Sequence, residues 1–331
     1  HHFNWKATVL TVDERDIEDD LSPDLEQLVD GSVEVIKVRA RPVFSVMGKR
    51  LIGDIGLRAF GALKRKAEAM LATSPFDFVW FSLPSWYTPL MGPGLSRKFG
   101  TPYGVDYRDP WVYQLAPEQR GFNRALATVT LARILEPIAL RRVSLISGVN
   151  DAYLGGISAR YPHLKQTQRT TFQMGFRTED HHIELSSFTS PFVEGHQTFV
   201  YAGAYSPNWY PLFRIWMDGL AKLNQWRPMK NVQFLFIGTH HPTLQSITEL
   251  ASEFGVTPLV REIPDRIPFL EVQQILRTAQ GSMVIGSTEP HYTASKLFQC
   301  LVTSQRTFAF FHEHSEGRKI LNLIEATQFF V

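Results

Sequence analysis

Short apolar runs alternate with longer amphipathic stretches along most of this chain. The apolar runs, rich in Val, Ile and Phe, predict buried strands, and the stretches of helical period between them predict helices. This alternation is typical of an α/β protein with parallel, doubly wound sheets. The predicted strands cover 6–12, 33–38, 76–81, 103–107, 143–147, 170–174, 198–202, 232–237, 257–260, 282–285, 306–311 and 327–331. The predicted helices cover 56–71, 122–142, 212–224, 242–254, 270–279 and 296–301.

The alternation is interrupted once, near the middle of the chain. Residues 179–197 are polar, turn-rich and aperiodic, as linkers are. We therefore predict a first domain at 1–178, a linker at 179–197 and a second domain at 198–331. Both halves read as Rossmann-like domains, and we expect them to face a cleft, because ligands of such sheets bind beyond the carboxyl ends of the strands.

Both ends of the pattern are abrupt. The first predicted strand begins at Lys6 with no strand and helix before it, and the last apolar run reaches Val331. We expect terminal segments of the fold to be missing from this sequence.

Composition and charge exclude several classes of protein. Hydrophobic residues at 44% and charged residues at 20% describe an ordinary globular chain. With 34 basic and 32 acidic residues, the chain lacks the basic excess of a nucleic-acid-binding protein. A single cysteine, Cys300, excludes an internal disulfide and indicates a reducing, cytoplasmic compartment. We expect no metal site, no transmembrane helix and no signal peptide.

A turn in the second half is the best candidate for binding chemistry. The apolar strand at 282–285 leads into a Gly/Ser turn, and Ser295-Lys296 opens an amphipathic helix. Free N–H groups and the positive end of the helix dipole attract phosphate, and Lys296 adds a full charge. A capping serine beside a solvated lysine is the alternative.

Glycines end two strands of the second half. Gly203 follows the strand at 198–202, and Gly238 follows the strand at 232–237. Glycine lets the backbone approach a ligand closely or adopt a positive φ. A plain strand-to-helix turn explains either position as well.

Charged residues gather at one strand end in the first half. Asp106, Arg108 and Asp109 follow or end the strand at 103–107, where they could orient an acceptor hydroxyl or take its proton. The alternative is an Arg108 salt bridge and an Asp109-Pro110 turn. Asn150 follows the next strand and reads either as a helix cap or as part of the acceptor side.

Taken together, these residues resemble a known family. Gly203, Gly238 and the run Ser295-Lys296-Leu297-Phe298 resemble nucleotide-sugar glycosyltransferases of the GT-B fold. The chain is most similar to the large retaining family that builds bacterial polysaccharides and glycolipids. The run Tyr107-Arg108-Asp109-Pro110-Trp111 also looks like one found in the first domain of such enzymes.

The resemblance implies a retaining, hexosyltransferase-type enzyme. A sugar would pass from a nucleotide diphosphate donor, held by the second domain, to an acceptor hydroxyl on the first. Catalysis would use Lys296, Asp106 and Asp109, with Arg108 and Asn150 on the acceptor side and neither metal nor cofactor. The donor-binding residues it implies are Gly203, Gly238, Arg266, Glu289, Ser295, Lys296, Leu297 and Gln299.

The implied acceptor is a carbohydrate, free or lipid-linked. A lipid-linked acceptor would bring the protein to the inner membrane face as a peripheral protein. The basic, apolar stretch at 41–66 could lie on a bilayer, or it could be a core helix with a solvated basic face.

Some positions depart from the family pattern. The family carries two glutamates around the second-half turn, and the corresponding positions here hold His291 and Gln299, with Glu289 as the nearest acid. The basic residues expected soon after Gly203 are absent from 204–210. A Gly-rich loop expected before Trp5 is also absent.

Three other functions stay open on this sequence. A nucleotide-sugar epimerase would have the same fold and turn over the donor without an acceptor. A non-catalytic nucleotide- or carbohydrate-binding subunit would suit Gln299. A periplasmic-type two-domain binding protein would require export.

Overall fold

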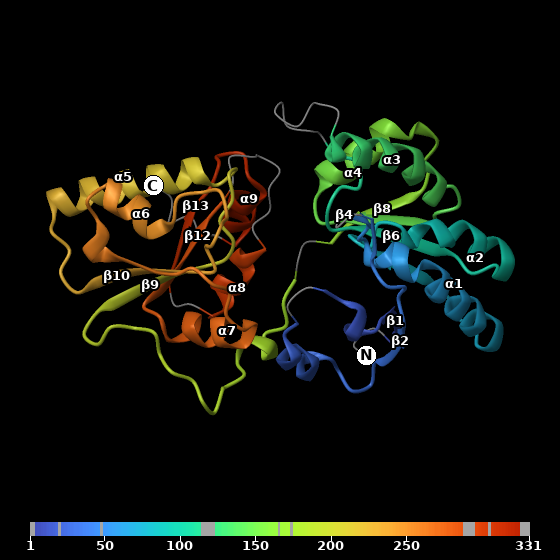
Figure 1. The fold of residues 1–331 in the computed structure, drawn as a ribbon, viewed down its shortest axis with the longest axis horizontal. Helices are drawn as coiled ribbons and strands as arrows, with labels where there is room; N and C mark the ends of the chain where they lie inside the picture. Colours follow the sequence, from blue (N-terminus) through green and yellow to red (C-terminus); the bar gives the residue numbers. More distant parts are fainter. Residues whose placement is uncertain are drawn as a thin grey trace. The chain divides into compact units, whose positions relative to one another are not determined.

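The computed structural model describes residues 4–18, 21–46, 49–113, 123–164, 166–172, 175–286, 295–303 and 306–324. The chain forms two compact units (Figure 1). Unit 1 comprises His1–Leu21 and Val29–Gln173, and unit 2 comprises Ser22–Leu28 and Met174–Val331.

Unit 1 is built on a four-stranded parallel sheet. Its strand order is β5-β6-β7-β8, with β5 at Val79–Ser82, β6 at Tyr103–Tyr107, β7 at Leu145–Gly148 and β8 at Gln168–Thr171. Every residue of β6 is buried, because strands flank it on both sides. Two further pairs of strands belong to this unit: the parallel pair β1 (Thr8–Val12) and β2 (Glu34–Val38), and the antiparallel pair β3 (Phe44–Val46) and β4 (Lys49–Ile52).

The helices of unit 1 begin at side-chain caps in three cases. Asp54, Asn123 and Asn150 each accept a hydrogen bond from a backbone N–H of the first turn, which satisfies a donor that the helix leaves free. The helices are α1 (Ile55–Thr73), α2 (Gly92–Phe99), α3 (Arg124–Ala139) and α4 (Asp151–Arg160). Short 3₁₀ turns lie at η1 (Glu14–Asp16), η3 (Thr88–Met91) and η5 (Pro162–Leu164).

Unit 2 is a doubly wound sheet with a core on each face. Alternate residues of one strand face opposite sides, so Tyr201 and Phe236 pack in one core while Val200 and Leu235 pack in the other. Figure 1 shows α5 and α6 on one side of this sheet and α7 and α8 on the other. The strands are β9 (Gln197–Ala202), β10 (Val232–Ile237), β11 (Val260–Ile263), β12 (Gly281–Ile285) and β13 (Thr307–Phe310). The helices are α5 (Tyr210–Trp226), α6 (Ile247–Glu253), α7 (Phe269–Thr278), α8 (Lys296–Thr303) and α9 (Glu316–Leu323), with 3₁₀ turns η2 (Pro23–Leu28), η6 (Glu179–His181) and η7 (Thr257–Leu259).

The strand order of unit 2 locates a ligand site. The order is β11-β10-β9-β12-β13, so the chain progresses outward from β9 in one direction and then restarts at β12 on its other side. In open parallel sheets, such a reversal leaves a crevice beyond the carboxyl ends of the two central strands. Here those strands are β9 and β12.

The α/β fold with parallel sheets predicted from the sequence is confirmed. The predicted strands at 103–107 and 232–237 coincide with β6 and β10. The strand predicted at 257–260 begins too early in the sequence. Residues 257–259 form a 3₁₀ turn, and β11 begins at Val260. Pro258 has a fixed φ and no N–H, and both suit the first turn of a helix, where that N–H would have no partner. The strand predicted at 327–331 lies outside the described residues. Helices α2 and α9 were not predicted, and α4 was anticipated only as the helix that Asn150 would cap.

Of the helices within the described residues, none is long and apolar enough to cross a lipid bilayer.

Candidate functional site

Lys296 and Gly203 meet at the strand reversal of unit 2. Lys296 is the first residue of α8, and Gly203 follows β9 with a φ of 150°. A Cβ atom on Gly203 would collide with Lys296 Nζ and lie 2.9 Å from Lys296 Cε. The backbone conformation therefore favours glycine at this position, and a larger residue would also displace the end of the Lys296 side chain.

Aromatic side chains surround the ammonium group of Lys296. Nζ donates a hydrogen bond of 2.7 Å to the Tyr201 hydroxyl and lies 4.2 Å from the centroid of that ring. It also lies 5.3 Å from the Trp209 ring. Among the described residues, no carboxylate forms an ion pair with it. Burial lowers the pKa of Lys296 to about 8.

The second glycine and the predicted arginine lie beside this pair. Gly238 directly follows β10 with a φ of 75°, and its N–H donates to the Ile263 carbonyl at 2.9 Å. A Cβ atom there would lie 3.8 Å from Arg266 Cγ and 4.0 Å from the Gly203 carbonyl oxygen. Arg266 is exposed, in the loop between β11 and α7. The structure thus brings together Gly203, Gly238, Arg266 and Lys296.

A carboxylate that the sequence reasoning missed holds the turn after Gly238. Glu262 Oε1 accepts a hydrogen bond of 2.6 Å from the hydroxyl of Thr239, which is buried. Its other oxygen accepts from the backbone N–H of Thr248 at 2.9 Å and from the Thr248 hydroxyl at 3.0 Å. Glu262 therefore ties the end of β10 to the first turn of α6.

Three other donor-side residues predicted from the sequence lie on α8 or directly before it, and they differ in how deeply they are buried. Ser295 is exposed, and its carbonyl accepts a hydrogen bond from the Phe298 N–H at 3.3 Å. Leu297 is fully buried in the core on the α7 side, where it anchors α8. Gln299 is partly buried, and its carbonyl accepts from the Thr303 hydroxyl at 2.6 Å. Glu289 and His291 lie outside the described residues.

In unit 1, Asp106 is held at the carboxyl edge of the sheet. It is buried, and it accepts a hydrogen bond from the hydroxyl of Ser147, its partner in the β6–β7 register. Arg108 Nε lies 3.7 Å from Asp106 Oδ2, with most of the arginine in solvent. Asp109 is exposed. Asn150 Oδ1 accepts from the Tyr153 N–H at 3.0 Å, which is the capping role stated as one alternative.

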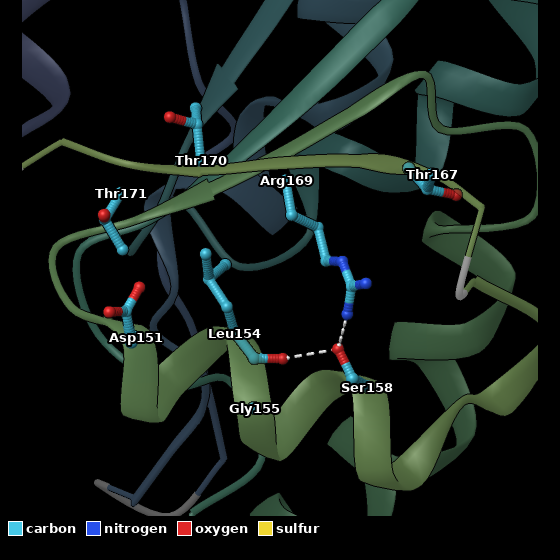
Figure 2. Close-up of a pocket in the computed structure, with 8 residues that line it drawn as sticks. All are labelled: Asp151, Leu154, Gly155, Ser158, Thr167, Arg169, Thr170 and Thr171. Atoms are coloured by element: carbon cyan, nitrogen blue, oxygen red, sulfur yellow. Dashed lines mark hydrogen bonds between the residues drawn. The ribbon is translucent and has the colours of Figure 1, made fainter.

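A pocket of about 640 Å³ lies between α4 and β8 in the same unit. Figure 2 shows Arg169 reaching from β8 to Ser158 on α4. Ser158 in turn donates to the Leu154 carbonyl at 2.8 Å. The volume falls within the range of small-molecule sites. Hydroxyls and two charges dominate the lining, which consists of Asp151, Leu154, Gly155, Ser158, Thr167, Arg169, Thr170 and Thr171.

One end of this pocket lies toward the edge that carries Asp106. Thr171 ends β8 and pairs in register with Gly148, just as Thr170 pairs with Ser147. Asp151 directly follows the cap residue Asn150. The α4–β8 pocket and the Asp106–Ser147 pair therefore belong to the same end of the unit 1 sheet.

Within the part of the chain that the structure describes, no group of three or more His, Cys, Asp or Glu side chains is placed to hold a metal ion.

Comparisons with known proteins identify the fold. No protein-family model matches the chain, and no curated protein matches it. A solved structure described as trehalose-6-phosphate from E. coli bound with UDP-2-fluoro glucose superposes with a TM-score of 0.58 at 9% identity, covering 96% of this chain and 86% of that one. The N-terminal domain of trehalose-6-phosphate phosphatase from Candida albicans gives a TM-score of 0.55 at 13% identity, with 99% and 83% coverage.

An apo structure of OtsA gives a TM-score of 0.54 at 9% identity and covers 78% of this chain. The chain spans 63% of that protein's length, which is less than two thirds. At these identities the comparisons show the fold, and this chain has the GT-B fold expected from the resemblance.

Proposed function

We propose that this protein is a retaining, metal-independent glycosyltransferase that moves a hexosyl group from a nucleotide diphosphate sugar to an acceptor hydroxyl. One observation carries the proposal. In a GT-B fold, Lys296 and Gly203 meet where the strand order of unit 2 reverses. That is the position at which sheets of this type bind nucleotides.

The donor diphosphate would lie between Gly203, Arg266 and the first turn of α8. Negative charge builds on the diphosphate as the glycosidic bond breaks, and the Lys296 ammonium together with the helix dipole would stabilise it. Such a site needs no metal ion to neutralise the leaving group. A uridine diphosphate hexose is the first donor to test, because a structural neighbour is described as bound with UDP-2-fluoro glucose.

The acceptor would occupy unit 1. Asp109 is exposed near the end of β6, where its carboxylate could orient an acceptor hydroxyl, while Ser147 fixes the Asp106 carboxylate. The α4–β8 pocket, with Arg169 and several hydroxyls, suits the polar body of a carbohydrate. The acceptor we propose is a carbohydrate, free or lipid-linked, in cytoplasmic polysaccharide or glycolipid synthesis. Sugar phosphates belong in the same test, because one neighbour is described in complex with glucose-6-phosphate.

Calorimetric titration with uridine, adenosine and guanosine diphosphates tests donor binding. We expect one of them to bind and Lys296→Ala to weaken that binding at least about 10-fold, since one charge-assisted contact is lost. Absence of binding by all three nucleotides would remove the basis of the proposal. Transfer is then tested with the matching nucleotide sugars and a panel of sugars, sugar phosphates and lipid-linked sugars.

Gln299 favours a second candidate, a non-catalytic nucleotide-binding subunit. It stands where the resemblance expects an acid, and an amide cannot supply a negative charge. Nucleotide binding without hydrolysis or transfer across the whole panel would select this candidate. Interconversion of donor sugars without an acceptor would instead indicate an epimerase.

A further inference from the structure

Helix α3 of unit 1 exposes a row of aliphatic side chains. Leu131, Ile134 and Ile138 are 42%, 58% and 45% exposed. Their spacing of three and four residues places them on one face of the helix. Leu126, at 36% exposure, lies near the start of the helix and outside this row.

The opposite face of α3 carries the acid of the helix. Glu136 is fully buried, and it accepts hydrogen bonds from the hydroxyls of Tyr107 at 3.1 Å and Tyr161 at 2.8 Å. It also pairs with Arg160 at 2.9 Å. A surface helix normally turns its apolar stripe inward and its charges outward. In α3 the inward face carries this acid beside the buried Val129, Ala132 and Ala139. The aliphatic row Leu131, Ile134 and Ile138 forms a second apolar face that points outward.

Within the described residues, the exposed charges that α3 and the two positions after Leu140 contribute are all basic. Arg133 lies on the flank of the row, and Arg141 and Arg142 follow the helix, all three of them exposed. Between residues 124 and 142 the sequence has no acid other than the buried Glu136. An apolar helix face whose own helix adds only exposed cations matches the boundary between acyl chains and anionic headgroups of a lipid bilayer.

A second copy of the chain fits this surface less well. Two α3 faces packed together would bring the same arginines against each other. One helix face is also small beside the roughly 800 Å² per partner that a stable interface buries.

The stretch at 41–66 is the membrane candidate from the sequence, and its second part forms α1. Within α1, Ala59 and Leu63 are buried in the core of unit 1, while Lys64, Arg65 and Lys66 are exposed. That part of the stretch is a core helix with a solvated basic face.

We propose that the α3 face formed by Leu131, Ile134 and Ile138 docks unit 1 on the surface of an anionic membrane. The inference rests on the proposed function only in that a lipid-linked acceptor would be reached from this surface; the docking itself needs no transfer chemistry. The aliphatic row enters the headgroup boundary, and Arg133, Arg141 and Arg142 contact lipid phosphates.

Vesicle co-sedimentation of the full chain tests the proposal. We expect binding to vesicles of phosphatidylcholine with about 30 mol % phosphatidylglycerol, and much weaker binding to phosphatidylcholine alone, because each basic residue near the surface favours the anionic lipid. Ile134→Ser/Ile138→Ser should lower the partition coefficient about 10-fold or more, since two aliphatic side chains leave the boundary. Arg133→Gln should lower it several-fold, and the loss should shrink at high salt.

A matched control comes from unit 2. Ile215 and Leu223 on α5 are 57% and 45% exposed, like Ile134 and Ile138, but the α5 surface also carries the Lys222–Asp218 ion pair. Ile215→Ser/Leu223→Ser should leave vesicle binding unchanged. Circular dichroism checks that all variants are folded.

Three results would overturn the proposal. They are failure of the unsubstituted chain to bind anionic vesicles, equal losses in the α3 and α5 variants, and a concentration-dependent dimer that only the α3 substitutions dissociate. The last result would assign the face to a second copy. Nucleotide titration of the same samples separates this outcome from the proposed function, because the α3 variants retain Lys296 and should bind nucleotide as before.

Discussion

The ammonium group of Lys296 lies 4.2 Å from the centroid of the Tyr201 ring and donates a hydrogen bond to its hydroxyl. Tyr201 in turn donates to the Ala204 carbonyl at 2.7 Å, so the tyrosine links the lysine to the turn that contains Gly203. No basic residue occurs in 204–210, where the family resemblance leads one to expect them. In this chain the contacts of the Lys296 ammonium are with the Tyr201 and Trp209 rings, among the described residues.

Nucleotide affinity should fall as the pH rises above about 8. Burial lowers the pKa of Lys296 to about 8, and a bound diphosphate favours the charged form. Below this pH the lysine is already protonated in the free protein. Above it, binding must take up a proton, so the dissociation constant should rise by up to about 10-fold per pH unit. Titration calorimetry between about pH 7 and pH 10 measures this change, and Lys296→Ala should remove the dependence. A flat profile for the unsubstituted protein would contradict the role assigned to Lys296.

Replacing Lys296 with methionine should stabilise the protein at neutral pH. The folded pKa is lowered from 10.5 to about 8, so folding below pH 8 keeps a charge in a site that disfavours it. The unfolded state binds more protons between these two values, and the stability of the unsubstituted protein therefore rises with pH across that window. The advantage of Lys296→Met should reach at most about 3 kcal/mol near pH 7 and vanish above about pH 10.5. Urea unfolding of both proteins at several pH values measures the difference. An advantage that grows with pH would show that the lysine is stabilised by its site.

Gly203→Ala should abolish nucleotide binding and destabilise unit 2 by about 1–3 kcal/mol, because the φ of 150° is strained for alanine and the new Cβ collides with Lys296 Nζ. Gly219→Ala on α5 is the control. A Cβ there meets nothing within 4 Å, so that change should raise stability by about 0.5–1 kcal/mol. Thermal unfolding and nucleotide titration give both readouts. Normal binding by Gly203→Ala would place the nucleotide elsewhere.

Glu136→Gln should cost about 2–4 kcal/mol of stability. The fully buried carboxylate serves Tyr107, Tyr161 and Arg160, and an amide would leave the arginine without its counter-charge. Glu68→Gln tests an exposed pair, Lys98–Glu68, and should change stability by less than about 1 kcal/mol. Chemical unfolding compares the two variants. Equal losses of stability in the two variants would mean that the buried Glu136 contributes no more to stability than an exposed ion pair does.

Gly155→Leu should obstruct the α4–β8 pocket. A Cβ on Gly155 points into open space, and a larger side chain would fill the volume beside Arg169. If the acceptor binds in this pocket, the KM for the acceptor should rise about 10-fold or more, while the dissociation constant of the nucleotide stays unchanged. Gly94→Leu on α2, also open around its Cβ, is the matched control. An unchanged acceptor KM in Gly155→Leu would exclude the pocket from the acceptor site.

Strand positions were predictable where burial dominates the local pattern. Residues 103–107 and 232–237 lie in strands flanked on both sides, and their predominantly aromatic and β-branched residues favour a strand. Helix α4 shows the opposite case. Gly155 and Gly156 lie in its interior and lower its intrinsic propensity, so its stability comes from packing of Leu154 and Ile157, which depends on the rest of unit 1.

The candidate site was predictable only in its local parts. Lys296 and Gly203 stand at strand and helix ends that the sequence itself indicates. Tyr201 reads as one more apolar residue of a strand, and its contact with Lys296 joins positions 95 residues apart. The Thr239–Glu262 bond likewise depends on the register of β10 and β11, which no local pattern specifies.

The reversal of strand order in unit 2 has a consequence for the order of folding. The β9–β12 pairing closes a long loop, and long-range pairing is slow because chain entropy is lost before contacts form. The contact between Tyr201 and Lys296 can form only after that pairing. A spectroscopic probe of the lysine, or the appearance of nucleotide binding during refolding, would therefore report the completion of unit 2, and chain fragments ending before β12 would acquire neither signal.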